Sequence, residues 1–340
     1  MKRKDFIKKG LASGAMAGTA SFGSGFNPVS DSFVQDDKDK KRMVAGDPEE
    51  IVIERPVPGQ PHKGKVLLAI QAHSDDIPLF AGGLVSKLLD EGYTGYLLRT
   101  SDDSSGDYMG NLTDNSKIAE YWGMKKAYDF FYKHHEMDAV QIQDLKARLI
   151  FLFRLLKVDT VICWDPWEHY EENPDHAVTG HAVEAARWMA QMETDYPEHF
   201  DAGLVPYGPA ERYYYSRDTQ RVNRIVDISN YIDQKVEVNM LNLTKGPAGK
   251  GDGQKLMDRL ASEGKKLPIL ENNGKSADFN YVKYGVFGID SRRLYVYFPT
   301  VSNKELGEQY GLEWAERYHY INDNIPDMTE QYIKDHAEPL

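Results

Sequence analysis

A short apolar segment at residues 66–70 stops abruptly in a cluster of ionisable side chains. The segment reads Val-Leu-Leu-Ala-Ile and is followed two residues later by His73-Ser74-Asp75-Asp76. Its length and its aliphatic, partly β-branched composition predict a buried strand rather than a helix. Open α/β sheets bind ligands beyond the carboxyl ends of their strands. His73 and Asp76 can turn toward one point there, which predicts a metal site completed by a ligand elsewhere in the chain.

Strand-like and helix-like segments alternate between residues 66 and 192. Strands are predicted from short aliphatic and aromatic runs, at residues 66–71, 93–100, 129–132 and 160–164. Helices are predicted between and after them from apolar spacing and from start or stop signals, at residues 83–91, 116–122, 144–157 and 176–192. This order predicts parallel βαβ units with right-handed crossovers, hence a mostly parallel sheet with helices on both faces.

The pattern changes after about residue 197, which predicts an elaborated C-terminal part. Short strands are expected at residues 212–216, 225–228 and 294–298, and a helix at 229–242. Residues 245–280 are rich in Gly, Lys and Asn and indicate a flexible insertion. We therefore interpret residues 46–340 as a single α/β domain.

The first 45 residues have the composition of an export signal followed by a disordered linker. Met1–Lys9 carries five basic residues, and Leu11–Phe22 is weakly apolar, rich in Gly, Ala and Ser, and without an acidic residue. The order from Arg3 to Lys8 resembles a twin-arginine signal in which Lys4 replaces the second arginine. We expect a periplasmic or extracellular protein; the alternative is a basic tail on a cytosolic one.

Composition excludes several classes of partner. The 340-residue chain has a formal net charge of −12 and no basic stripe, so nucleic-acid binding is not expected. A single cysteine, Cys163, cannot form an intrachain disulfide. No apolar run approaches the roughly 18 residues that a membrane span requires, so no integral membrane segment is expected in the mature chain.

A second polar cluster follows the strand predicted at residues 160–164. It contains Asn173-Pro174-Asp175-His176 at the start of a helix. A histidine in this place, after a strand of the same sheet, can face the loop that carries His73 and Asp76. Two imidazoles and one carboxylate leave a coordination position open, which is typical of catalytic rather than structural zinc; iron and cobalt are alternatives.

Together the two clusters resemble the signature motifs of a known enzyme family. Ala72-His73-Ser74-Asp75-Asp76 with Gly82-Gly83, and Asn173-Pro174-Asp175-His176, are similar to the motifs of the PIG-L/LmbE-like de-N-acetylases, which run Ala-His-Pro-Asp-Asp and His-Pro-Asp-His. The resemblance covers about residues 64–240. It implies a Rossmann-like α/β fold and a zinc-dependent hydrolase that removes the N-acetyl group from an N-acetylglucosamine-type sugar or glycoconjugate.

The resemblance also implies roles for individual residues. His73, Asp76 and His176 would hold one Zn²⁺ per chain, or another divalent transition metal. Asp75 would be the general base toward a zinc-bound water. Asn173 stands where the family commonly has a histidine that stabilises the oxyanion or protonates the leaving amine. An asparagine can donate a neutral hydrogen bond there but cannot deliver a proton.

Because Asn173 cannot deliver a proton, the sequence does not decide which group protonates the leaving amine. The proton would come from Asp75 or from one of the ionisable groups closest in sequence, His169, Glu171 and Glu172. Two other hypotheses stand beside the de-N-acetylase. One is a catalytically impaired carbohydrate-binding protein on the same fold, and the other is an amidase that acts on another amide.

Other polar residues receive a mainly structural interpretation. His134-His135 has no matching partner in the sequence and is interpreted as a solvated loop pair. Asp102, Asp103 and Asp107 follow a predicted strand. Binding of sugar hydroxyls is one interpretation of these residues, and an exposed acidic loop is the favoured one. His169 is a less favoured candidate for the substrate site. The alternatives for the two motifs are a capping turn after the first strand and an ordinary helix start at Asn173.

Overall fold

The computed structural model describes residues 51–104, 113–139, 142–169, 171–217, 221–243, 251–271, 274–289, 301–324 and 328–339. The predicted export segment, residues 1–45, the strand predicted at residues 294–298, and Asp107 lie outside the described residues. Among the helices that are described, none has the length and apolar character needed to cross a membrane.

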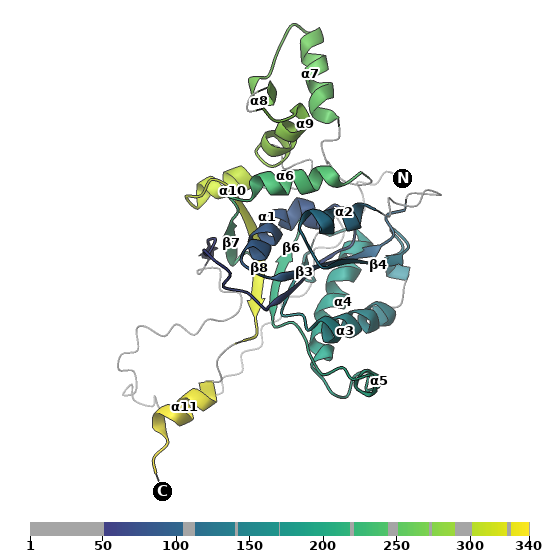
Figure 1. Cartoon of the computed structure of the whole chain (residues 1–340), viewed down its shortest axis with the longest axis vertical. Coiled ribbons are helices and arrows are strands. Elements are labelled where there is room, and N and C mark those ends of the chain that lie inside the picture. The colour runs from purple at the N-terminus through teal and green to yellow at the C-terminus, as the bar shows by residue number, and fades with distance from the viewer. Residues whose placement is uncertain are drawn as a thin grey trace, which may run out of the picture. The chain divides into compact units, whose positions relative to one another are not determined.

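An eight-stranded sheet forms the centre of the described structure, in the order β1-β7-β8-β6-β5-β2-β3-β4 (Figure 1). The strands are β1 (Val52–Glu54), β2 (Val66–Gln71), β3 (Thr94–Ser101), β4 (Lys126–Tyr132), β5 (Thr160–Trp164), β6 (Glu211–Tyr215), β7 (Arg224–Asp227) and β8 (Ala315–Asn322). Neighbouring strands are parallel except for the two antiparallel pairs that β8 makes with β6 and β7. The predicted α/β fold with a mostly parallel sheet is confirmed.

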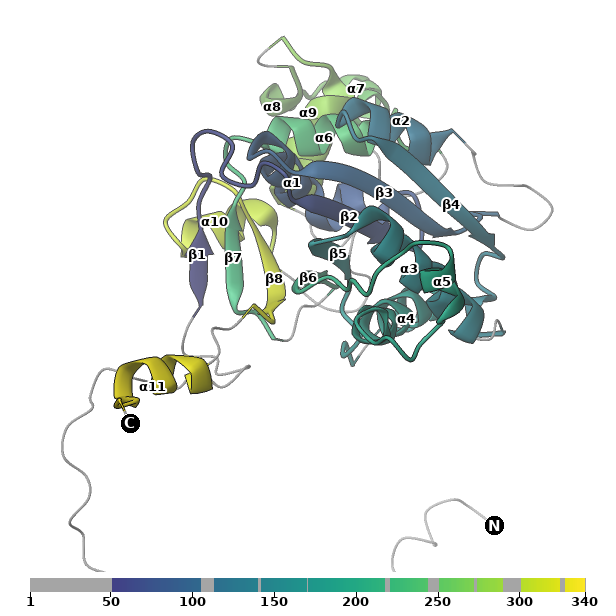
Figure 2. The same ribbon diagram turned by 60° about the horizontal axis from the view of Figure 1, so that its bottom comes forward.

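Helices cover both faces of this sheet (Figure 2). The helices α1 (Asp76–Asp90), α2 (Asp114–Tyr121) and α6 (Ile232–Leu241) lie on one face, and α3 (Ile142–Leu156) and α4 (Pro174–Ala190) lie on the other. The remaining described helices are α5 (Glu198–Asp201), α7 (Asp252–Ser262), α8 (Pro268–Glu271), α9 (Ala277–Asn280), α10 (Asn303–Gln309) and α11 (Met328–His336), with a 3₁₀ turn at Met137–Ala139 and a π-helical stretch at Tyr281–Val286.

The central strand β2 contributes to the cores on both faces. Leu67 and Ala69 belong to the core beneath α1, whereas Leu68 and Ile70 belong to the core beneath α3 and α4, and all four are fully buried. Alternate side chains of a strand point to opposite faces, so a strand covered on both sides is apolar throughout. Burial of each Leu or Ile side chain contributes about 1.5–3 kcal/mol. The end of β2, where the polar cluster begins, is therefore held rigidly.

The Gly82-Gly83 pair is a packing requirement of α1. A Cβ atom on Gly83 would lie 2.5 Å from Ile228 Cγ2, and one on Gly82 would lie 3.1 Å from Lys235 Cγ. Lys235 is itself buried, and its Nζ donates to Glu316 Oε1 at 2.6 Å. Through these contacts α1, the helix that begins at Asp76, packs closely against α6 and the residues just before it.

The C-terminal part contains several short helices and one strand that was not predicted. The described part of residues 245–280, interpreted as a flexible insertion, contains the helices α7, α8 and α9. The Asp278 carboxylate accepts from the backbone N–H groups of Gly251 and Gln254, which caps the start of α7. The strand that completes the sheet is β8, which was not predicted, because its pairing partners lie about 100 residues earlier in the chain.

Candidate active site

The candidate site lies where two neighbouring strands end. β2 and β5 are parallel neighbours, so their carboxyl ends lie at the same edge of the sheet. The turn after β2 carries His73 and leads into α1, whose first residue is Asp76. The loop after β5 leads into α4, whose third residue is His176. The sheet topology therefore brings together the three predicted metal ligands, which are 103 residues apart at most.

Three atoms that can bind a metal face one another in this cluster. His73 Nδ1 lies 3.0 Å from His176 Nε2, His176 Nε2 lies 3.5 Å from Asp76 Oδ1, and Asp76 Oδ1 lies 3.8 Å from His73 Nδ1. Ligands at about 2.0–2.1 Å from a tetrahedral zinc are about 3.3 Å apart. The triangle thus has the size of one face of such a site, and its residues are at most 4% exposed.

The two oxygens of the Asp76 carboxylate have different neighbours. Oδ2 accepts from the backbone N–H of Ala72 and of His73, at 2.8 and 2.9 Å, and from Trp164 Nε1 at 2.8 Å. Oδ1 is left facing the two imidazoles. Burial alone would raise the pKa of Asp76, but the charges and hydrogen bonds of His176 and His73 hold it well below its ordinary value. An ionised carboxylate is therefore fixed in place toward the centre of the triangle.

His73 is oriented by a second carboxylate on its outer side. His73 Nε2 lies 3.0 Å from Asp175 Oδ2, which also accepts from His135 N at 2.8 Å. Burial lowers the pKa of His73, but Asp175 and Asp76 outweigh this effect and raise the pKa to about 10. Surroundings that favour a positive charge so strongly suit a metal cation, and a carboxylate behind the imidazole is the usual support of a metal-binding histidine.

His176 is supported by an aromatic ring and an acidic side chain. Its imidazole stacks on the Trp164 indole, with ring centroids 3.8 Å apart and an interplanar angle of 13°. Its Nδ1 lies 3.1 Å from Glu171 Oε1, without the alignment of a hydrogen bond. Glu171 Oε1 also accepts from Asn173 N at 2.8 Å, and Arg217 Nε lies 3.6 Å from its other oxygen. Each imidazole of the triangle thus has a carboxylate beside its outer nitrogen.

A comparison with known families assigns this part of the chain. Residues 68–187 match the family of GlcNAc-PI de-N-acetylases, PIG-L, and this range includes all three residues of the triangle. This part of the chain is similar to PIG-L domains. The resemblance seen in the two motifs is confirmed.

Two proteins named as diacetylchitobiose deacetylases are similar to this chain. A diacetylchitobiose deacetylase of Thermococcus kodakarensis is 28% identical over 183 residues, which cover 51% of this chain and 67% of the relative. The structure of N,N'-diacetylchitobiose deacetylase from Pyrococcus horikoshii, in complex with an inhibitor, superposes with a TM-score of 0.55 at 21% identity, covering 81% of this chain and 87% of that one. A conserved protein from Thermus thermophilus has a TM-score of 0.50 at 15% identity, covering 76% and 94%. These structures share the fold.

Asp75, the predicted general base, lies between His73 and Asp76 in the sequence. It precedes α1, and its side chain makes no capping hydrogen bond, so the alternative of a helix-capping Asp75 is wrong. Burial and the nearby carboxylates of Asp76 and Asp103 raise the pKa of Asp75 to about 7. Asp75 is half-buried, and its role as the general base stays a prediction.

Asn173 caps the helix that carries His176. Its Oδ1 accepts from Asp175 N at 3.0 Å, with extended backbone angles and Pro174 as the next residue. The helix-start interpretation of this motif is confirmed. The carbonyl oxygen is occupied by the cap, and the Nδ2 group is the part of the side chain that can donate to a substrate. A catalytic role for Asn173 stays a prediction.

The loop after β3 is more buried than predicted. Asp103 is 1% exposed and accepts from Arg99 Nη1 at 2.7 Å and from Ser74 N at 3.1 Å, so the interpretation of Asp103 as part of an exposed acidic loop is wrong. Ser74, which replaces the family's usual proline, also accepts a hydrogen bond from Asn242 Nδ2 at 3.0 Å. The buried Arg99 on β3 was the signal for this arrangement, because a buried guanidinium requires a carboxylate partner.

The two less favoured site residues have different positions. Asp102 Oδ1 accepts from Ser104 N at 2.9 Å and from His134 N at 3.0 Å, which joins the loops after β3 and β4. Substrate binding by Asp102 stays a prediction. His169 is exposed, and among the contacts of the described residues none joins it to the triangle.

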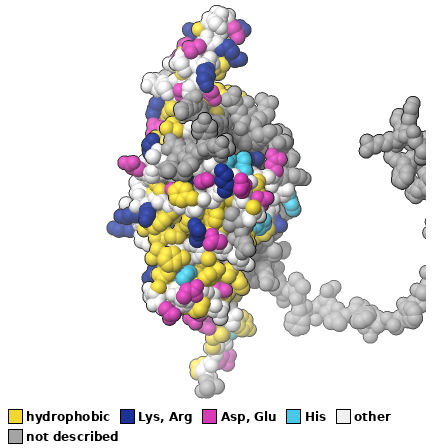
Figure 3. Space-filling view, turned by 90° about the vertical axis from the view of Figure 1, so that its right-hand side faces the viewer, with side chains coloured by type: hydrophobic (Ala, Val, Ile, Leu, Met, Phe, Trp, Pro, Cys, Tyr) yellow, Lys and Arg dark blue, Asp and Glu magenta, His cyan; other side chains and the backbone are white. Residues whose placement is uncertain are grey.

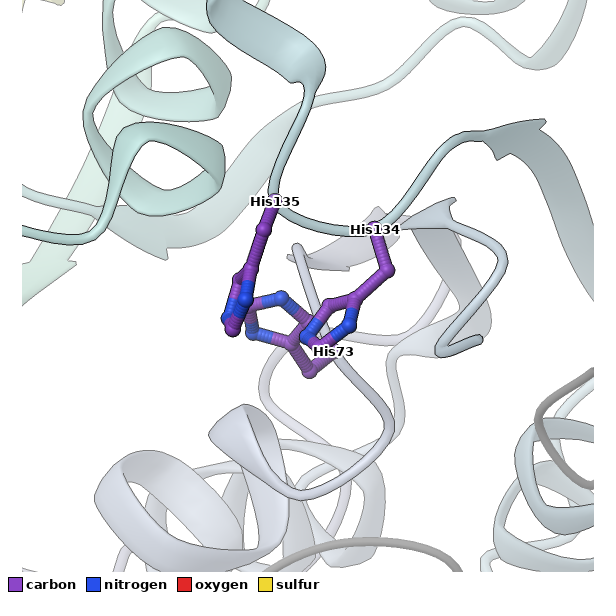
Figure 4. Close-up of side chains that lie close together, drawn as sticks. All are labelled: His73, His134 and His135. Carbon is purple, nitrogen blue, oxygen red and sulfur yellow. The ribbon is translucent and has the colours of Figure 1, made fainter. Parts of the chain in front are cut away.

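His134 and His135 lie beside the site instead of forming a separate solvated pair (Figure 4). Their ring centroids are 4.8 and 6.1 Å from that of His73, and both rings are nearly perpendicular to it. The turn that carries them follows β4, at the same edge of the sheet as the ends of β2 and β3. The position of this pair directly after a strand was a signal that sequence reasoning did not use. Histidine side chains reach the molecular surface near acidic and basic groups on the side shown in Figure 3.

Proposed function

We propose that this protein is a metal-dependent de-N-acetylase that hydrolyses the N-acetyl group of an N-acetylglucosamine-type sugar or glycoconjugate. The observation that carries the proposal is the buried triangle of His73, Asp76 and His176 with Asp75 adjacent to it, inside the part of the chain that is similar to PIG-L domains. The relatives named as diacetylchitobiose deacetylases support an N-acetylated sugar as the substrate class.

The donor set fits a zinc ion or another divalent transition metal. Two imidazole nitrogens and one carboxylate oxygen are typical ligands of catalytic zinc, and each imidazole has a carboxylate at its outer nitrogen. His73, Asp76 and His176 would hold the ion. When bound, it would supply Lewis acidity toward the amide carbonyl and lower the pKa of water.

Asp75 acts as the general base in this proposal. It accepts a proton from the attacking water, which becomes part of the acetate product, while the carbon–nitrogen bond of the amide breaks. The leaving nitrogen must gain a proton, and Asp75 can return the one that it accepted. Asn173, two residues before Asp175 at the helix start, would contribute only a neutral hydrogen bond from its Nδ2 group and would not deliver a proton.

Acetate release from N-acetylated saccharides tests this function. We expect N,N'-diacetylchitobiose or N-acetylglucosamine to be deacetylated, and Asp75→Asn to lower kcat by about 10²–10⁴-fold while the metal is retained. His181→Ala, an exposed substitution on α4, is the matched control and should leave kcat unchanged. Sugar binding without acetate release from any saccharide would favour the impaired binding protein, and release from other amides only would favour the amidase.

Metal analysis tests the ligand set independently of turnover. Purified protein is expected to contain about one zinc per chain, as for a single catalytic site. His73→Ala and His176→Ala should each lose it. Retention of the full metal content by both variants would show that the triangle is not the metal site.

We further propose that the segment up to residue 45 exports the protein. The proposal rests on the basic residues at positions 1–9 and the acid-free, Gly- and Ala-rich stretch at 11–22.

A further inference from the structure

A second group of potential metal ligands lies next to the triangle. Figure 4 shows the imidazoles of His73, His134 and His135 converging, and one nitrogen from each lies within 4.8 Å of the others. The rings of His134 and His135 are packed on each other, with centroids 3.7 Å apart. His73 is thus shared by two sets of ligands, one with Asp76 and His176 and one with the histidine pair.

The turn that carries the pair is held by its backbone. Asp102 Oδ1 accepts from His134 N at 3.0 Å, and Asp175 Oδ2 accepts from His135 N at 2.8 Å. His135 adopts a left-handed backbone conformation with φ of 62°, which turns the chain sharply at this point. The two carboxylates thus fix the peptide groups of the turn from which both imidazoles project.

We propose that His134 and His135, with His73 as the shared ligand, form a second binding site for a divalent transition metal ion. An all-imidazole donor set suits zinc, copper, nickel and cobalt, whereas magnesium and calcium prefer oxygen ligands. Nitrogen ligands of one such ion are about 3.3 Å apart, so nitrogens that now lie within 4.8 Å of one another must approach by up to about 1.5 Å. The site goes beyond the proposed function and does not depend on it.

The two sites differ in access to solvent. His135 is exposed, His134 is half-buried and His73 is buried, so the ligands of the second site extend from the surface to the triangle. All three residues of the triangle, in contrast, are buried. An ion at the second site is therefore expected to exchange faster with solution than one in the triangle. Sharing of His73 couples the occupancy of the two sites.

Copper binding to a His176→Ala variant tests the second site, because this change removes one ligand of the triangle. We expect about one equivalent of Cu²⁺ to bind, with nitrogen superhyperfine splitting from three imidazoles in the electron paramagnetic resonance spectrum. Splitting from a single nitrogen would place the ion on His73 and Asp76 alone and would overturn the proposal. These readouts need no turnover, so they are independent of the deacetylase activity.

Removal of the pair in the same background gives the second measurement. His134→Ala/His135→Ala should weaken Cu²⁺ binding by at least about tenfold, a change of about 1.4 kcal/mol. His181→Ala in that background is the control and should leave the affinity unchanged. If the alanine variant unfolds, as judged by circular dichroism, His134→Gln/His135→Gln replaces it. An affinity that does not change in the folded variant refutes the second site.

Discussion

The carboxylate of Asp175 holds the imidazole of His73 in position. The variant Asp175→Asn therefore tests how much this orientation contributes to metal binding, because His73 itself is kept. In the structure this side chain accepts from His73 Nε2 at 3.0 Å, from His135 N at 2.8 Å and from Met137 N at 3.3 Å. Burial alone would raise the pKa of Asp175, but its hydrogen bonds lower it, so the group is an anion in the folded protein. An asparagine keeps the shape and loses the charge and one acceptor atom.

The size of the effect follows from these contacts. A hydrogen bond to a charged group contributes about 1.5–3 kcal/mol and a neutral one about 0.5–1.5 kcal/mol. Replacing the charged acceptor of His73 by a neutral amide oxygen therefore costs about 1–2 kcal/mol of the energy that orients the imidazole. At about 1.4 kcal/mol per tenfold change, the zinc dissociation constant should rise by about 5–30-fold. Loss of such supporting partners typically weakens metal binding by about 10–100-fold.

Competition with a chromogenic chelator measures this dissociation constant. Asp102→Asn is the matched control, because Asp102 anchors the same turn through His134 N but does not contact His73 in the structure. We expect Asp175→Asn to weaken zinc binding and Asp102→Asn to leave it unchanged. Equal losses in both variants would show that the turn, and not the orientation of the imidazole, controls affinity. Wild-type affinity in Asp175→Asn would refute the reasoning altogether.

Three further predictions concern packing and targeting. Gly83→Ala should lower the free energy of unfolding in urea by about 1–3 kcal/mol, because the new Cβ would meet the branched side chain of Ile228; an unchanged midpoint would contradict this packing. Lys235→Met should cost about 3–5 kcal/mol in the same assay, because Glu316 would stay buried without its cation, and Glu316→Gln in the same chain should restore much of the loss. Deletion of residues 1–22 should retain the protein in the cytosol, as judged by cell fractionation; a full-length chain found there intact would refute export.

The ligand triangle was predictable because its parts are marked locally. The strands β2 and β5 are short, apolar and fully buried apart from the first residue of β2, and each ends before a polar cluster. Parallel neighbours bring such ends together, so the strand pattern and the position of the histidines suffice to predict His73, Asp76 and His176 in one place. The confirmed helices on both faces follow from the same alternation.

The parts that were missed depend on long-range contacts. β8 joins the sheet between β6 and β7 as an antiparallel strand, which no local periodicity indicates. The burial of Asp103 depends on its contact with Ser74 N, 29 residues earlier in the turn after β2, besides its ion pair with the buried Arg99 on β3. His134 and His135 were judged without a partner because their partner, His73, lies across two strands of the sheet. In each case the segment is polar or weakly periodic, and contacts with residues far away in the sequence determine its position.

The departure of Asn173 from the family pattern has a local explanation in the structure. Asparagine is among the best helix N-caps, and Asn173 Oδ1 fixes the first turn of α4, where both Asp175 and His176 lie. The substitution therefore preserves the part of the site that would hold the metal. It removes only a proton donor from the position beside it. The two hypotheses, an active deacetylase and an impaired sugar-binding protein, therefore assume the same metal site. They differ in whether the proton that Asp75 accepts can reach the leaving nitrogen.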